Sequence, residues 1–152
     1  MRYGHKTVLA EVAEVPEEHW GDTGVCGVWS TKDILAHLAS YELALGDVLL
    51  TLVGDEPTPY LDAFLAAGAD FNDDQVEIRR HQSGSETLAE YTRAYERVAA
   101  IAPNIPEEKW RETGTIPWYG TVYSVDDLVV YQYYGHKREH CAQVAVFVDG
   151  LS

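Results

Sequence analysis

A ten-residue pattern occurs twice in this chain and limits its fold more than any other sequence feature. Residues 15–24 read VPEEHWGDTG and residues 105–114 read IPEEKWRETG. Each copy leads through a loop with Gly and Trp into Ser-x-x-Asp, at Ser30 and at Ser124, a sequence typical of helix N-termini. The alternative is that Pro-Glu-Glu is a common turn and Trp a common loop anchor. The repetition favours two similar helical hairpins, which together would form a four-helix bundle.

The spacing of apolar residues supports the same architecture. Helical periodicity predicts three long helices, over residues 31–53, 85–102 and 124–147. Shorter helices are expected over residues 2–14, 60–67 and 72–81. The hairpins then span residues 2–53 and 85–147, joined by a long, partly helical crossover. We therefore expect an all-α fold in which residues 1–152 form a single domain.

Composition excludes several classes of function. The chain has 25 acidic and 11 basic residues, and a net charge of −14 argues against nucleic acids and anionic membranes as partners. No apolar run approaches the roughly 20 residues of a membrane helix, and the start of the chain lacks the features of a signal peptide. Two cysteines, Cys26 and Cys141, make no disulfide framework and are expected to be small buried residues. We expect a cytoplasmic protein.

The residues that most clearly suggest a metal site are histidines. His136 and His140 are four residues apart, which places both imidazoles on one face of a helix, about one turn apart. His37, on the equivalent helix of the first hairpin, would complete a three-nitrogen metal site. The residues expected to face the bundle interior from the last helix are Leu128, Val129, Gln132, His136, His140, Gln143, Val144 and Phe147. The alternative is a buried polar cluster without metal, which would need hydrogen-bond partners for the ring nitrogens.

Three neutral imidazoles suit zinc, nickel or ferrous iron and leave a coordination position open, as in catalytic sites. Gln143, one turn beyond His140, is expected to hydrogen-bond a ligand or a metal-bound water. Glu42 and Glu139 are the nearest carboxylates, and we expect a solvated or supporting role rather than catalysis. The remaining histidines are assigned no role; they are His5, His19 and His81.

The motifs around these histidines resemble a known group of proteins. They are WSTKDILAHL at residues 29–38, Phe71-Asn72, and His136-x-x-x-His140-x-x-Gln143. Over nearly the whole chain they resemble the DinB/YfiT-like superfamily, and most closely its ClbS/DfsB branch and the related mycothiol-dependent maleylpyruvate isomerase amino-terminal domains. The resemblance implies a four-helix bundle with a divalent metal on His37, His136 and His140. Candidates for the pocket or for supporting the ligands are Gln143, Tyr41, Trp29 and Asn72.

The resemblance also implies a function class. Superfamily members are often homodimers, and those with known activities include thiol-dependent transferases and isomerases, and hydrolases of reactive small molecules. We therefore expect a metal-dependent enzyme acting on a small molecule, with a low-molecular-weight thiol as a candidate cosubstrate. The alternative is a non-catalytic stress protein that binds a metal or a small molecule. Four loop aromatics either line the pocket or anchor the loops; they are Trp29, Trp118, Tyr119 and Tyr123.

One feature departs from the family pattern. Family members usually have a longer first helix, whereas only a short helix fits before Pro16. We expect apolar surface to be left near one end of the site. That surface would widen the substrate entrance or be covered by a second subunit, unless the true start of the chain lies further upstream.

Overall fold

The computed structural model describes residues 1–54 and 56–151, and these residues form helices and loops. The α-helices are α1 (Arg2–Ala13), α2 (Thr31–Leu50), α3 (Pro59–Ala67), α4 (Phe71–Ile78), α5 (Gly84–Ile101), α6 (Glu107–Arg111), α7 (Val125–Leu128) and α8 (His136–Asp149). A π-helical segment, Val129–Gly135, joins α7 to α8. Single turns of 3-10 helix occupy Glu17–His19, Gly68–Asp70 and Ala102–Asn104. The predicted all-α class is confirmed.

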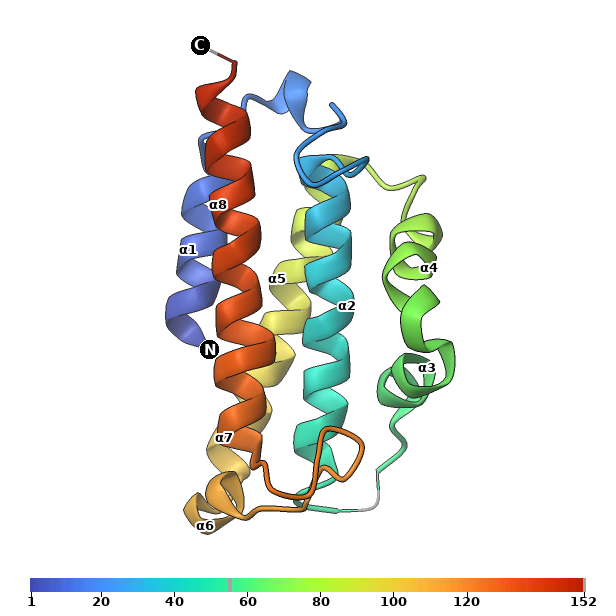
Figure 1. The fold of residues 1–152 in the computed structure, drawn as a ribbon, viewed down its shortest axis with the longest axis vertical. Coiled ribbons are helices and arrows are strands. Elements are labelled where there is room, and N and C mark those ends of the chain that lie inside the picture. Colours follow the sequence, from blue (N-terminus) through green and yellow to red (C-terminus); the bar gives the residue numbers. More distant parts are fainter. Residues whose placement is uncertain (55, 152) are drawn as a thin grey trace.

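Four rods form the bundle, as Figure 1 shows: α1, α2, α5 and the continuous α7–α8 rod. Helices α3 and α4 belong to the crossover and lie outside the bundle, against α2. Helix α2 is therefore covered on several sides, and most of its residues are buried. Among the described helices, none has the length and apolar character of a membrane-spanning segment.

Side chains at the helix N-termini explain where the long helices begin. The Ser30 hydroxyl accepts a hydrogen bond from the Asp33 backbone at 3.2 Å, and the Asp33 carboxylate accepts one from the Ser30 backbone at 2.9 Å. Ser124 and Asp127 make the same reciprocal pair at the start of α7. Each pair satisfies backbone N–H groups that the first helical turn leaves free. The predicted caps at Ser30 and Ser124 are confirmed.

A buried carboxylate fastens the crossover to the bundle. Asp47 of α2 is fully buried, and its carboxylate accepts hydrogen bonds from the backbone of Tyr60 and Leu61 at 2.7 and 3.1 Å. The other oxygen accepts a hydrogen bond from Arg97 of α5 at 2.6 Å. The negative charge lies at the N-terminus of α3, where the helix dipole favours an anion. Asp47 thus fixes α3 and α5 to the same turn of α2.

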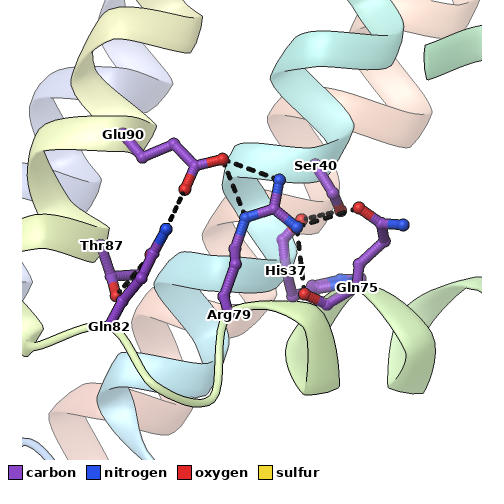
Figure 2. A network of polar contacts seen from close by, with 7 residues as sticks. All are labelled: His37, Ser40, Gln75, Arg79, Gln82, Thr87 and Glu90. Atoms are coloured by element: carbon purple, nitrogen blue, oxygen red, sulfur yellow. Dashed lines mark hydrogen bonds and ion pairs between the residues drawn. The ribbon is translucent and has the colours of Figure 1, made fainter. Parts of the chain in front are cut away.

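A second polar network holds the end of α4 against α5. The buried Arg79 guanidinium donates to Glu90 at 2.8 and 2.9 Å and to the side chain of Gln75 at 2.9 Å. Gln82 donates to the other Glu90 oxygen at 2.7 Å. Figure 2 shows this network beside the turn of α2 that carries His37 and Ser40. The helix predicted over residues 72–81 therefore ends at Ile78, and Arg79 leads into the turn before α5.

The last helix differs from the prediction in its register. Gln132 was expected to face the interior, but it is exposed, whereas Tyr133 and Lys137 are buried. The cause is the π-helical segment, whose i→i+5 hydrogen bonds widen the turn and rotate the following residues relative to a regular α-helix. After this segment, His140 and Val144 return to the buried face as predicted.

Helix α1 covers only part of the α7–α8 rod. The Tyr3 ring contacts the Tyr134 ring with centroids 6.2 Å apart, so the first turn of α1 lies beside Tyr134. Figure 1 shows that α7 extends beyond the end of α1. Beyond this point the π-helical segment exposes Val130 and Tyr131, which are 52% and 65% accessible. Apolar side chains are therefore exposed on the π-helical segment that precedes His136.

Candidate metal centre

Three histidine side chains meet between α2 and α8. The Nε2 atom of His136 lies 2.9 Å from Nε2 of His37 and 2.9 Å from Nε2 of His140. One ligand atom from each ring lies within 4.8 Å of the other two. Ser40 donates a hydrogen bond to the His37 carbonyl at 2.7 Å, one turn along α2. The structure thus brings together the three histidines that the sequence singled out, and they can hold a metal ion.

Burial keeps these imidazoles neutral. Desolvation, reinforced by the neighbouring histidines, lowers the pKa of His37 to about 2. Desolvation, with His140 and the positive charge of Lys137, lowers the pKa of His136 to about 4. Desolvation also lowers the pKa of His140, although the Gln143 hydrogen bond and Glu139 oppose it. Neutral imidazole is the form that binds a metal ion, so the cluster is ready for ligation at neutral pH.

Gln143 determines which nitrogen of His140 faces the cluster. The Gln143 side-chain oxygen lies 2.8 Å from Nδ1 of His140. When Nδ1 donates its proton there, Nε2 carries a lone pair and points toward His136. Hydrogen-bonded partners of this kind orient metal-ligating histidines and make them more basic.

The arrangement of nitrogens suits a cation better than a purely hydrogen-bonded cluster. A proton on Nε2 of His136 can be donated well to only one of its two neighbours, each 2.9 Å away. Nδ1 of His37 is buried and has no hydrogen-bond partner among the described residues. A divalent ion at the centre would accept a lone pair from all three Nε2 atoms at once.

Aromatic side chains surround the histidines. The Tyr41 ring lies 4.8 Å from the His37 ring and 4.9 Å from the His136 ring, measured between centroids. The Tyr41 hydroxyl donates to the Asn72 side-chain oxygen at 3.3 Å, which links α2 to α4. On the opposite side, the Trp29 ring lies 5.0 Å from the His37 ring. The candidate residues Trp29 and Tyr41 therefore lie against the cluster, and Asn72 contacts Tyr41.

Two ionisable residues next to the site form a buried ion pair. Glu42 was expected to be either solvated or supporting; it is buried and pairs with Lys137, which is buried as well, so the solvated alternative is excluded. Lys137 falls outside the residues predicted to face the bundle interior. The burial of a lysine directly after His136 can be recognised only once the π-helical register is known. Glu139 is exposed, as expected.

The cluster opens to solvent on the side of His136, the least buried of the three histidines. A cavity of about 350 Å³ is lined there by Tyr41, Tyr131, Gln132, Gly135, His136 and Glu139. A larger cavity of about 520 Å³ lies on the Trp29 side against α4, and charged residues such as Asp33, Asp73 and Arg80 line it. No histidine of the cluster lines the larger cavity. The His136 side is therefore the direct approach to the cluster.

Comparison with known protein families identifies the family of this chain. The family model of the mycothiol maleylpyruvate isomerase N-terminal domain matches residues 1–126. The chain belongs to this family. No curated protein and no solved structure gives a significant match.

The mycothiol maleylpyruvate isomerase N-terminal domain family is DinB-like and metal-binding, as the resemblance implied. The matched residues include His37, Tyr41 and Asn72 and end before His136 and His140. The two histidines of α8 lie outside the segment that the family model covers, and their place in the cluster comes from the structure.

Proposed function

We propose that this member of the family is a divalent-metal-dependent enzyme that acts on a small molecule, with His37, His136 and His140 as the metal ligands. The convergence of three Nε2 atoms, with that of His136 2.9 Å from each of the other two, carries the proposal. All three donors are nitrogens, which suits zinc, nickel or ferrous iron. When bound, such an ion supplies Lewis-acid chemistry and lowers the pKa of a coordinated water or thiol.

The surrounding residues have definite tasks in this proposal. Gln143 keeps the Nε2 lone pair of His140 directed at the cluster through the 2.8 Å hydrogen bond to Nδ1. Trp29 covers His37 and His140 from one side, with ring centroids 5.0 and 6.5 Å away, and excludes water there. Burial raises the pKa of Tyr41, so its hydroxyl keeps its proton and remains a hydrogen-bond donor near His136. Substrate then approaches through the cavity beside His136.

A thiol-dependent transferase or isomerase is the reaction class we favour, because the family name refers to a mycothiol-dependent isomerase. In this version a low-molecular-weight thiol is the cosubstrate and a small electrophile is the substrate. A hydrolase, which needs water instead of a thiol, is the second version. A non-catalytic protein of the same fold that binds a metal or a small molecule is the rival class.

Metal analysis of protein purified without a histidine tag tests the ligand assignment. We expect about one equivalent of a transition metal, either as purified or after reconstitution, as for a site with three protein ligands. His37→Ala and His140→Ala should each lose high-affinity binding, whereas His81→Ala, a change at an exposed histidine, should keep it. Less than about a tenth of an equivalent in the reconstituted wild type contradicts a metal site of this affinity.

Activity profiling separates the reaction classes. Metal-loaded and chelator-treated protein would be compared on a panel of electrophiles and esters, with and without mycothiol, bacillithiol or glutathione. Turnover that needs both metal and thiol supports the transferase or isomerase. Turnover that needs metal alone supports the hydrolase. Full metal occupancy without turnover on any substrate favours the binding protein.

We further propose that residues 1–152 act as one domain in a homodimer in the cytoplasm. The exposed apolar side chain of Val130, which lines neither cavity, belongs to a surface for a second copy. Both cysteines are free thiols, which suits a reducing compartment. Light scattering should give twice the chain mass of 17.0 kDa, and Val130→Glu should give the single-chain mass. A monomeric wild type would contradict the dimer.

A further inference from the structure

A groove of aromatic side chains extends the cavity beside His136. A second cavity of about 350 Å³ is lined by Phe64, Leu65, Gly68, Trp118, Tyr119 and Gln132. Gln132 also lines the cavity at His136, so the two cavities share a wall. The second cavity lies between α3 and the loop that joins α6 to α7, and Gln132 of the π-helical segment borders both cavities. Together they lead from the histidine cluster to the outer surface of the crossover.

The aromatic rings along this path contact one another in sequence. The Tyr41 ring, beside His136, lies 5.8 Å from the Phe64 ring. The Phe64 ring lies 5.7 Å from the Trp118 ring, and Trp118 lies 6.2 Å from Tyr119. All three contacts are edge-to-face, a geometry that aromatic pairs prefer. The walls come from α2, α3 and the loop before α7, and Trp118 remains 36% exposed.

Charge decides what this groove can accept. Among the residues that line the two cavities, none is lysine or arginine, and the single carboxylate is Glu139. The chain as a whole carries a net charge of −14. A ligand with its own carboxylate or phosphate would lie in the groove with no cationic side chain to pair with it, and such a ligand is disfavoured. Aromatic walls favour burial of a planar apolar group.

We infer that this aromatic groove, defined by Phe64, Trp118, Tyr119 and Gln132, binds an uncharged aromatic part of the substrate whose reacting end lies at the histidine cluster. The inference rests on the proposed metal-dependent function, because the cluster supplies the anchor for the reacting end. Cavities of a few hundred Å³ match small ligands of this kind. The substrate class is thus a neutral aromatic small molecule rather than a small dicarboxylate.

Hydroxamic acids provide probes that separate the ring from the metal-binding group. Cobalt-loaded protein would be titrated with benzohydroxamic acid, with acetohydroxamic acid, which lacks the ring, and with 4-carboxybenzohydroxamic acid, which adds a charge. Burial of the ring should make benzohydroxamic acid bind at least about tenfold more tightly than acetohydroxamic acid. The 4-carboxy compound should bind at least about tenfold more weakly than benzohydroxamic acid.

Variants of groove residues test whether the preference for the aromatic ring arises in the groove. Trp118→Leu and Tyr119→Leu should each reduce the preference for the ring to within about threefold while cobalt content and acetohydroxamic acid affinity stay unchanged. Tyr3→Leu, at an exposed tyrosine outside the groove, should leave the preference intact. Equal affinity of the two uncharged probes in cobalt-loaded wild type overturns this inference alone. Tight binding of the 4-carboxy compound overturns the charge preference, and failure to take up cobalt overturns the proposed function as well.

Discussion

Glu42 and Lys137 form an ion pair in the interior of the bundle that joins the two helices bearing the histidine cluster. Glu42 lies little more than one turn after His37 on α2, and Lys137 directly follows His136 on α8. The ammonium group also lies 5.8 Å from the ring centroids of Tyr91 and Tyr95 of α5. A charge buried this deeply is stable only with its partner, because removal of one member leaves the other desolvated and unpaired.

We predict that Lys137→Met lowers the free energy of unfolding by about 3–5 kcal/mol, since Glu42 would remain buried without a counter-charge. The double variant Glu42→Leu with Lys137→Met should regain most of this loss, because an apolar pair carries no desolvation penalty. Urea unfolding followed by circular dichroism measures both. Lys109→Met, which breaks an exposed pair with Glu112, is the control and should barely shift the midpoint. A Lys137→Met variant as stable as that control would contradict the prediction.

Substitution of Gln143 should weaken metal binding without removing a ligand. Gln143→Leu deletes the acceptor for Nδ1 of His140, so we expect metal affinity to fall by about 10–100-fold. Gln143→Glu keeps an acceptor in place and should retain most of the affinity. Competition with a chromophoric chelator measures the change, and Arg138→Leu on the same rod is the control because Arg138 is exposed and lines neither cavity. Equal affinity in the Leu and Glu variants would show that this hydrogen bond does not orient His140.

The metal-free protein should lose stability as the pH falls through the range in which free histidine titrates. The pKa of His37 is lowered to about 2 in the folded state, so the unfolded chain binds its proton first, near pH 6.5. The contribution of neutral His37 is therefore complete above about pH 6.5 and is lost progressively below it. His37→Gln should reduce the dependence of the unfolding free energy on pH by about 1.4 kcal/mol per pH unit between about pH 5.5 and pH 4.

Chemical denaturation of metal-free protein at a series of pH values measures that slope. His81→Gln replaces an exposed histidine and should leave the slope as in the wild type. If His37→Gln also leaves it unchanged, His37 is solvated in the metal-free state and the buried cluster described here does not persist without metal.

Local signals in the sequence were sufficient for the helices and for the three histidines. The hydroxyl–carboxylate pairs at Ser30 and Ser124 act within one helical turn, so a short sequence pattern identifies them. His136 and His140 are related by helical spacing alone, and the duplicated hairpin indicated which helix would present His37. Each of these inferences depends on contacts within a few residues, or on the pairing of two long amphipathic helices.

The features that were missed depend on contacts distant in sequence. The π-helical segment moves Gln132 outward and Lys137 inward, and a regular 3.6-residue periodicity cannot anticipate it. Glu42, the partner of Lys137, is on α2, so its burial in an ion pair could not be inferred from the sequence either. Phe64 and Trp118 come from separate connecting segments, and only the folded crossover places their rings 5.7 Å apart.

X-ray absorption at the metal edge of the zinc-loaded protein tests the central claim most directly. Three imidazole ligands from His37, His136 and His140 should give nitrogen scatterers at about 2.0–2.1 Å, with the outer-shell pattern of three rings. His37→Ala, loaded at a zinc concentration high enough to fill its weakened site, should show a pattern of two rings. A sulfur scatterer at about 2.3 Å, or a wild-type spectrum that His37→Ala leaves unchanged, would contradict the three-histidine metal centre.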